Sequence, residues 1–209
     1  MQSSIFLHHT EKMPVLLLIK ISKKGGIPRT IYGSFLEFLY HFVNSKYGFW
    51  SQEIENRGFD LPADSNSISQ HWYAFPSEAS GSHELVEGGY NKNGVYCQRI
   101  TKSDNSEGTV GICQELLVNG DIGQEVYIYF KGNNSNPKLK IKIYSKDFTE
   151  VLFVAESNNS TDKWSKMSVS VPALHHNFIQ FSLVLDDLGS IDLDEVSLMP
   201  EDNVEGVRR

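Results

Sequence analysis

From about residue 90 onward, turn-forming residues divide the sequence into short apolar runs, and this pattern is its strongest constraint on the fold. The clearest run is Lys138 to Tyr144, in which polar and apolar residues alternate strictly. A period of two is typical of a strand with one buried and one solvated face. The other runs that we predict to be strands are Val95 to Thr101, Val110 to Val118, Glu125 to Lys131, Val151 to Glu156, Trp164 to Val171, Phe178 to Leu185 and Ile191 to Leu198.

The segments between these runs are rich in residues that favour tight turns. They include Asn119-Gly120-Asp121, Gly132-Asn133-Asn134, Asn158-Asn159-Ser160 and Asp186 to Gly189. Eight short strands at this spacing, with no helical pattern between them, favour an antiparallel jelly-roll β-sandwich of the galactose-binding-like kind. We therefore expect a mainly β chain.

The composition supports a folded core and argues against two classes of partner. Hydrophobic residues make up 40% of the 209 residues, which is too large a share for an intrinsically disordered chain. Lys and Arg number 19 and Asp and Glu number 26, so the net charge is −7, and no basic run is present. Because nucleic acids and anionic membranes bind basic surfaces, we expect neither as a partner.

The longest apolar run is Pro14 to Ile19, and it ends at Lys20. It is shorter than the roughly 18 residues that suggest a membrane span. The charged residues on both sides of it do not fit a signal peptide. We therefore predict no export signal and a cytoplasmic location by default, while secretion stays open.

Cys97 and Cys113 are the two cysteines, and no metal or redox motif can be built from them. If their segments are neighbouring strands, a disulfide between them is geometrically allowed. Without an export signal, two reduced and half-buried thiols are the favoured alternative.

The first sixty residues have a different character. Ile31 to Phe42 is dense in large apolar residues, and Ile54 to Phe59 is a mixed stretch compatible with a helix. The polar connector Leu61 to Ser67 follows. This change of composition predicts a domain boundary near residue 62.

Three stretches together resemble a known enzyme family. Ile31 to Glu37 (IYGSFLE), followed by Gly48 to Asp60 (GFWSQEIENRGFD), resembles the amino-terminal signature of α-L-arabinofuranosidases of glycoside hydrolase family 51. Asp194 to Arg209 resembles the junction at which members with an inserted carbohydrate-binding module return to the catalytic barrel. The sequence between them is similar to carbohydrate-binding modules of families 4 and 9.

This resemblance implies a (β/α)8 barrel that is interrupted after its first strand and helix by a β-sandwich. Residues 14–61 would then form the incomplete start of the barrel, residues 62–200 the carbohydrate-binding sandwich, and residues 201–209 the return to the barrel. The first-strand Glu of the family contacts arabinose, and Glu37 occupies that position. Phe38 replaces the His that usually follows, which puts the fine substrate geometry in doubt.

The resemblance also implies that the catalytic residues are absent. In the family, the acid/base and nucleophile glutamates lie on barrel strands beyond the junction matched by residues 194–209. A retaining glycosidase needs two carboxyl groups about 5 to 5.5 Å apart on a rigid scaffold, and one barrel strand cannot hold both. We therefore expect this chain alone to be catalytically inactive, with Glu37 binding sugar or standing as an exposed carboxylate.

Sugar recognition by a β-sandwich combines aromatic platforms with side chains that hydrogen-bond hydroxyl groups. The aromatic candidates, most of which should be core residues, are Trp72, Tyr73, Tyr90, Tyr96, Tyr127, Tyr129 and Trp164. Tyr127 and Tyr129 share one face of their strand, opposite Val126, Ile128 and Phe130, and are our predicted ligand contacts. Trp164 resembles the core tryptophan that opens a strand in such modules, so its burial is favoured.

Asp192 and Asp194 lie in the last predicted strand, where strict alternation would place them on the face of Val196 and Leu198. A buried carboxylate there needs hydrogen bonds, a cation or a bulge that turns it outward. A structural calcium ion is one alternative, and a carboxylate that caps backbone amides is the favoured one. No other cofactor is expected.

The leading hypothesis is the amino-terminal part of an α-L-arabinofuranosidase that acts on arabinose-containing plant polysaccharides, the present chain supplying carbohydrate binding. The alternatives are a stand-alone carbohydrate-binding module and a non-functional truncated product. The expected partners are arabinan, arabinoxylan or xylan. We also predict that the unpaired apolar segment Ile31 to Phe42 either packs irregularly on the sandwich or causes self-association.

Overall fold

The computed structural model describes residues 51–76, 81–91, 94–103, 108–133 and 136–207. Within these ranges the chain forms ten β-strands and no helix. The strands are β1 (Tyr73–Phe75), β2 (Ser82–Glu87), β3 (Tyr96–Lys102), β4 (Val110–Leu117), β5 (Gln124–Asn133), β6 (Lys138–Ser145), β7 (Val151–Asn159), β8 (Ser165–Val171), β9 (Phe178–Leu185) and β10 (Gly189–Pro200).

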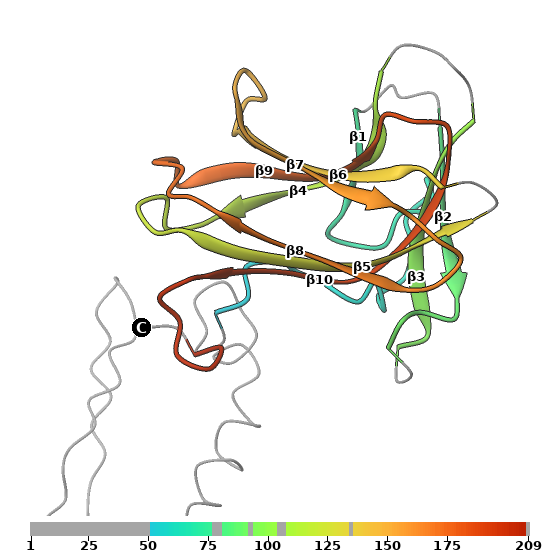
Figure 1. Cartoon of the computed structure of the whole chain (residues 1–209), viewed down its shortest axis with the longest axis horizontal. Coiled ribbons are helices and arrows are strands. Elements are labelled where there is room, and N and C mark those ends of the chain that lie inside the picture. The colour runs from blue at the N-terminus through green and yellow to red at the C-terminus, as the bar shows by residue number, and fades with distance from the viewer. Residues whose placement is uncertain (1–50, 77–80, 92–93, 104–107, 134–135, 208–209) are drawn as a thin grey trace, which may run out of the picture. The chain divides into compact units, whose positions relative to one another are not determined.

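The strands form two sheets, which appear in Figure 1 as an upper layer with β9, β6 and β4 and a lower layer with β8, β5 and β10. The first sheet has the order β1-β4-β9-β6-β7, and the second has the order β2-β3-β10-β5-β8. Every pair of neighbouring strands is antiparallel. The prediction of an antiparallel β-sandwich is therefore confirmed.

One hydrophobic core fills the space between the inner faces of the two sheets. In β6, Leu139, Ile141 and Ile143 are fully buried, whereas the lysines that alternate with them are half-buried. Burying such an aliphatic side chain contributes about 1.5–3 kcal/mol. The alternation in the sequence thus maps directly onto the two faces of the strand.

All eight predicted strands are present, with ends that shift by at most a few residues. The sequence analysis missed β1 and β2. β1 is only three residues long, and β2 has the mixed pattern Ser-His-Glu-Leu-Val-Glu. Both are edge strands, and an edge strand in contact with solvent needs little apolar periodicity to hold its place.

The described residues that precede β1 belong to the same core. Phe59 and Trp72 are fully buried with ring centroids 5.3 Å apart, and Trp72 meets Phe181 of β9 edge-on at 6.4 Å. The amide of Glu53 donates to the carbonyl of Leu198 at 2.9 Å. Residues 51–61 thus pack against the sandwich core, although they precede the boundary predicted near residue 62.

The stretch that was compatible with a helix, residues 54–59, forms a turn. Asn56 and Phe59 both have left-handed backbone conformations, with φ of 47° and 56°. A helix cannot continue through such residues. The rest of the predicted barrel start, residues 14–50 with Glu37, lies outside the described residues.

Cys97 and Cys113 are free thiols in β3 and β4, which belong to different sheets. Both are buried rather than half-buried as predicted, with 1% and 7% exposure. Burial raises the pKa of Cys97 to about 12 and that of Cys113 to about 11. Both thiols therefore stay protonated at neutral pH and act as small core residues.

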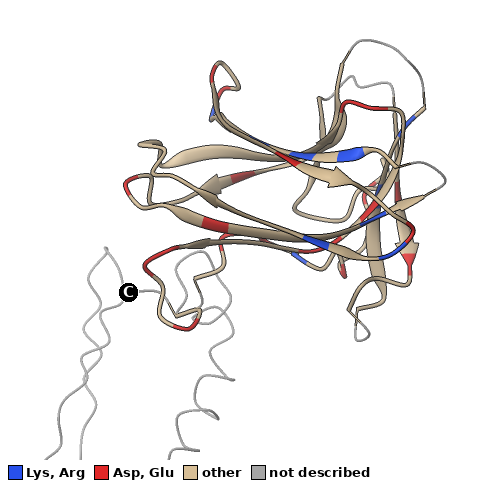
Figure 2. Cartoon of the chain, viewed as in Figure 1, with Lys and Arg blue, Asp and Glu red and all other residues tan. Residues whose placement is uncertain are grey.

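Basic and acidic segments are interspersed on both layers rather than gathered on one of them (Figure 2). These segments belong to the described part of the chain. In that same part, no helix is long and apolar enough to cross a membrane.

Candidate functional site

The outer face of the second sheet carries the two tyrosines that the sequence selected. In β5, Val126, Ile128 and Phe130 are buried, and Tyr127 and Tyr129 are half-buried on the opposite face. β5 pairs with β10 on one side and with β8 on the other, so these two rings lie inside the sheet rather than at its edge.

Two further aromatic residues join these tyrosines from distant parts of the chain. Tyr90, in the loop after β2, stacks on Tyr129 with ring centroids 3.7 Å apart and an interplanar angle of 13°. Trp164, just before β8, meets Tyr90 edge-on at 6.1 Å, and Tyr127 meets Tyr129 edge-on at 6.3 Å. The two edge-on contacts have the favoured edge-to-face geometry, whereas the 3.7 Å stack brings the rings of Tyr90 and Tyr129 almost face to face.

These rings border a cavity of about 600 Å³, which we call the tyrosine cleft. Its lining residues are Tyr90, Asn91, Tyr127, Tyr129, Lys166 and Glu195. The cleft thus combines aromatic surface with an amide, an ammonium group and a carboxylate. Aromatic walls with a few polar groups are typical of sites for small organic ligands.

Positively charged side chains lie against the aromatic faces of this region. The Nζ atom of Lys166 is 4.2 Å from the ring centroid of Tyr127 and 5.8 Å from that of Tyr129. Arg57 approaches Tyr127 at 5.6 Å, and Lys131 approaches Trp164 at 5.1 Å. Each contact falls within the range of cation–π attraction.

Arg57 fixes one side of the cleft. Its Nη2 donates to the hydroxyl of Tyr127 at 2.7 Å and pairs with the carboxylate of Glu195 at 2.7 Å. Its Nε donates to the carbonyl of Val196 at 3.3 Å. Arg57 belongs to the stretch that resembles the arabinofuranosidase signature, and here it holds that stretch against β10.

A β-bulge in β10 places the acidic residues on the outer face. The register of β10 against β5 shifts between Asp194 and Ser197, and Glu195 has φ of 51°. One extra residue reverses the alternation. Asp192 and Asp194 therefore face outward while Val196 and Leu198 remain in the core.

Asp192 is fully buried and is neutralised by cations of the protein. Its carboxylate pairs with Arg99 at 2.6 Å and with Lys131 at 3.1 Å, and it accepts a hydrogen bond from the side-chain amide of Asn133 at 2.7 Å. A carboxylate with 0% exposure needs such partners, because charge is costly to remove from water.

Asp194 caps backbone amides. It is 1% exposed and accepts hydrogen bonds from the amides of Tyr90 (2.6 Å), Asn91 (3.2 Å) and Glu195 (2.7 Å). Burial raises the pKa of this carboxyl to about 6, although the three amides oppose the shift. A Cβ atom at Gly89 would come within 2.5 Å of Asp194 Oδ2, so glycine is needed for the loop to approach.

Asp194 therefore fits the alternative of a carboxylate that caps backbone amides. Asp192 instead forms ion pairs with cationic side chains of the protein. No group of three or more His, Cys, Asp and Glu side chains among the described residues could hold a metal ion. The calcium prediction for Asp192 and Asp194 finds no support in these contacts.

The other aromatic candidates differ in burial and in position. Trp72 is a core residue, and Tyr73 is 64% exposed on β1 of the other sheet. Trp164 is half-buried beside the tyrosine cleft, so the prediction that it lies in the core is wrong. Lys166 was not predicted; its place opposite Tyr129 follows only from the pairing of β8 with β5.

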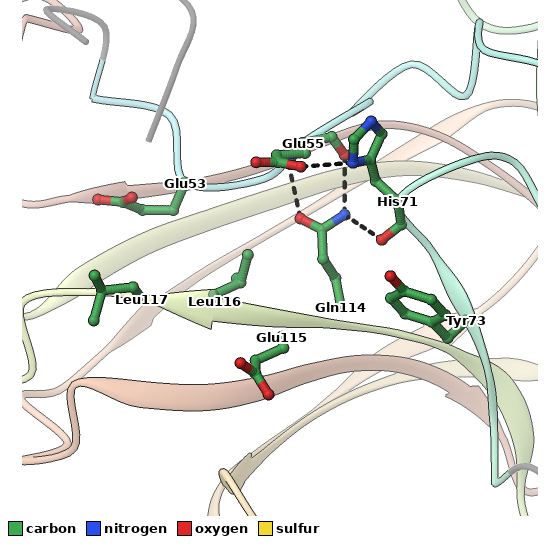
Figure 3. A pocket seen from close by; sticks show the side chains of 8 residues that line it. All are labelled: Glu53, Glu55, His71, Tyr73, Gln114, Glu115, Leu116 and Leu117. Carbon is green, nitrogen blue, oxygen red and sulfur yellow. Dashed lines mark hydrogen bonds and ion pairs between the residues drawn. The ribbon is translucent and has the colours of Figure 1, made fainter. Parts of the chain in front are cut away.

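A second, smaller cavity of about 130 Å³ lies beside β4 (Figure 3). His71 Nδ1 pairs with Glu55 at 2.6 Å, and the amide of Gln114 bonds to the backbone of both residues. The polar groups in this cavity thus bind one another and join the segment before β1 to β4. These contacts have a structural role. The cavity is also small for a sugar.

Comparison with known proteins rests on structure alone. Neither a family model nor a curated protein sequence matches the chain. Among solved structures, the chain is similar to an arabinose-bound MgGH51 α-L-arabinofuranosidase, with 15% identity and a TM-score of 0.63. That match covers 77% of this chain and only 28% of the enzyme.

Isolated modules match over nearly their whole length. A CBM4 structure shows 18% identity and a TM-score of 0.54, covering 71% of this chain and 99% of the module. The CBM22-1 xylan-binding domain of Paenibacillus barcinonensis Xyn10C shows 16% identity and a TM-score of 0.52, covering 71% and 94%. At these identities the likeness establishes the fold, which is the jelly-roll β-sandwich of carbohydrate-binding modules.

Proposed function

We propose that this chain binds plant polysaccharides or oligosaccharides through the tyrosine cleft. The observation that carries the proposal is the stack of Tyr90 on Tyr129, in which Tyr90 keeps 42% of its surface exposed. The ring of Tyr129 supports the ring of Tyr90 and fixes its orientation. The exposed surface of Tyr90 can then cover the apolar C–H face of a sugar.

The polar groups around this platform suit the hydroxyl groups of a sugar. Asn91 and Glu195 line the cleft together with Lys166 and the tyrosines. The volume of about 600 Å³ lies within the range of ligand sites. The fold supports the same proposal, because the matched domain from Xyn10C is a xylan-binding one. Xylan, arabinoxylan and arabinan are therefore the ligands to test.

The test is a calorimetric titration of the full chain with xylohexaose, an arabinoxylan oligosaccharide and an arabinan oligosaccharide. We expect measurable binding to at least one of them. Tyr90→Ala should weaken that binding about tenfold, which corresponds to about 1.4 kcal/mol. Tyr73→Ala is the matched control, because it removes an exposed tyrosine from the other sheet. Flat titrations, or equal losses in both variants, would contradict the proposal.

A second candidate function is that of the amino-terminal part of an α-L-arabinofuranosidase. It is favoured by the likeness to the MgGH51 enzyme and by the signature-like stretch that includes Arg57. In that case Glu37 would contact arabinose, and the catalytic glutamates would lie in another part of the protein. The sandwich would then bring the enzyme to its polysaccharide.

Two experiments address this candidate. Sequencing the gene past Arg209 should reveal an open frame with two later barrel-strand glutamates, and a stop codon there would favour the stand-alone module. The purified 209-residue chain should not hydrolyse an aryl α-L-arabinofuranoside, because the reaction needs two closely spaced carboxyl groups. Detectable turnover would show that this chain already holds a catalytic pair.

A further inference from the structure

The carboxylates that face the tyrosine cleft already have partners within the protein. Glu195 pairs with Arg57 at 2.7 Å and accepts a hydrogen bond from the side-chain amide of Asn91 at 2.9 Å. Asp194 is 1% exposed and accepts three backbone amides. Asp192, farther along β10, pairs with Arg99 and Lys131. Each of these carboxylates is therefore neutralised or hydrogen-bonded within the protein.

Lys166 differs from the other cations on this face. Its side chain is exposed, and no carboxylate of the described residues lies within 4.0 Å of its ammonium group. Its close neighbours are the ring faces of Tyr127 and Tyr129, at 4.2 and 5.8 Å. Arg57 and Lys131, by contrast, each pair with a carboxylate. Lys166 is thus a cation with donors left for a ligand.

We infer that the tyrosine cleft selects saccharides that carry a carboxylate, that is, glycans substituted with uronic acid, through the ammonium group of Lys166. This inference rests on the proposed function and names the ligand class of the same site. A sugar ring placed on Tyr90 would hold its carboxylate within the same cleft as Lys166. The resulting charge-assisted hydrogen bond is roughly twice as strong as a neutral one.

Because the chain as a whole is negatively charged, selection of an acidic saccharide has to come from a particular cationic group in the cleft. A net charge of −7 repels a polyanion, so the overall charge of the chain does not account for binding of an acidic glycan. Among the residues that line the cleft, the interaction then depends on the exposed ammonium group of Lys166. Because salt screens exposed charges, affinity for the acidic ligand should fall between 20 and 500 mM NaCl, while affinity for a neutral ligand should hardly change.

The experiment compares three matched ligands by calorimetry on the full chain. The first is a xylo-oligosaccharide substituted with glucuronic acid, the second is the same compound with its carboxyl group reduced to an alcohol, and the third lacks the substituent. We expect the acidic ligand to bind about tenfold more tightly than the other two. Lys166→Gln should lower the affinity for the acidic ligand to that for the two neutral ligands, so that the preference disappears.

Lys163→Gln is the matched control, because Lys163 is an exposed lysine on the same segment that does not line the cleft. It should keep the preference, and melting curves should show that both variants are folded. Equal binding of all three ligands would overturn the inference and leave the proposed function in place. A Lys166→Gln variant that weakens all ligands equally would also overturn it, in favour of an uncharged contact. Absence of binding by the unaltered chain would overturn both.

Discussion

The outer faces of the two sheets both carry aromatic clusters, but the clusters are built differently. On the first sheet, Phe75, Tyr144 and Phe148 pack on one another with ring centroids 5.2–5.5 Å apart. β4 and β9 lie between β1 and β6 in that sheet, so this aromatic cluster bridges the strands beneath it. Cys113 and Ser182 lie on the same face of β4 and β9 and are nearly inaccessible.

The charged groups around Asp186 on the first sheet are likewise engaged with one another. Asp186 pairs with Lys140 at 2.8 Å and with Lys142 at 3.3 Å, and it accepts the hydroxyl of Thr109. On the second sheet, by contrast, the rings border a cavity of about 600 Å³ and Lys166 has no ion-pair partner among the described residues. The comparison teaches that aromatic density alone does not identify a binding site. A site also needs ring surface and polar groups that the protein itself has not used.

The largest expected effect tests the buried charge of the second sheet. Asp192→Ala leaves Arg99 and Lys131 without their shared carboxylate and should lower the free energy of unfolding by about 3–5 kcal/mol. Asp186→Ala, the control on the first sheet, removes a partly exposed carboxylate and should cost about 1 kcal/mol. Urea denaturation of both variants measures the difference. Equal losses would show that the two acidic centres are equivalent.

The second prediction concerns pH, because the pKa of Asp194 on the second sheet is raised whereas that of Asp186 on the first sheet is lowered. Burial raises the pKa of Asp194 from 3.8 to about 6. The folded state then binds a proton more tightly than the unfolded state between those values, so its stability falls as the pH rises from 4 to 6. The expected loss is up to about 3 kcal/mol. Asp194→Asn does not titrate, so the variant should gain stability relative to the unaltered chain across this range.

Asp186→Asn is the control variant, for which we expect the opposite dependence of stability on pH. Burial would raise the pKa of Asp186, but hydrogen bonds from Lys140 and Thr109 and the charge of Lys142 outweigh it and lower the pKa to about 2. Its stabilising contribution is present above pH 4 and is lost as the pH falls toward 2. The cost of this substitution should therefore shrink in acid. Urea denaturation as a function of pH measures these changes. If the stability of both variants had the same pH dependence as that of the unaltered chain, the predicted difference between Asp194 and Asp186 would be refuted.

The sequence predicted the parts of this molecule that depend on local periodicity. Apolar runs between turn residues identified eight strands, and alternation placed Tyr127 and Tyr129 together on one face. It could not show that Tyr90 and Lys166 join them, because that meeting depends on the order β10-β5-β8 and on a loop held by Asp194. Residues far apart in the sequence give no local signal of such contacts.

One alternative that the pattern left open and one wrong prediction have definite physical causes. The bulge at Glu195 is a single left-handed residue, and an apolar pattern does not report the backbone angle that produces it. Trp164 was assigned to the core because it opens a strand, yet β8 is an edge strand whose outer side faces the tyrosine cleft. An aromatic residue at such an edge can serve the surface as well as the core.

The smallest expected effect separates structural aromatic residues from binding ones. Tyr144 is half-buried and contacts both Phe75 and Phe148, so Tyr144→Ala should leave a gap in the cluster and lower the free energy of unfolding by about 2 kcal/mol. Saccharide affinity should stay unchanged, because Tyr144 lies on the first sheet and does not line the tyrosine cleft. Urea denaturation and calorimetry on one preparation measure both quantities. A loss of affinity with unchanged stability would reverse the roles of the two faces and move the binding site to the first sheet.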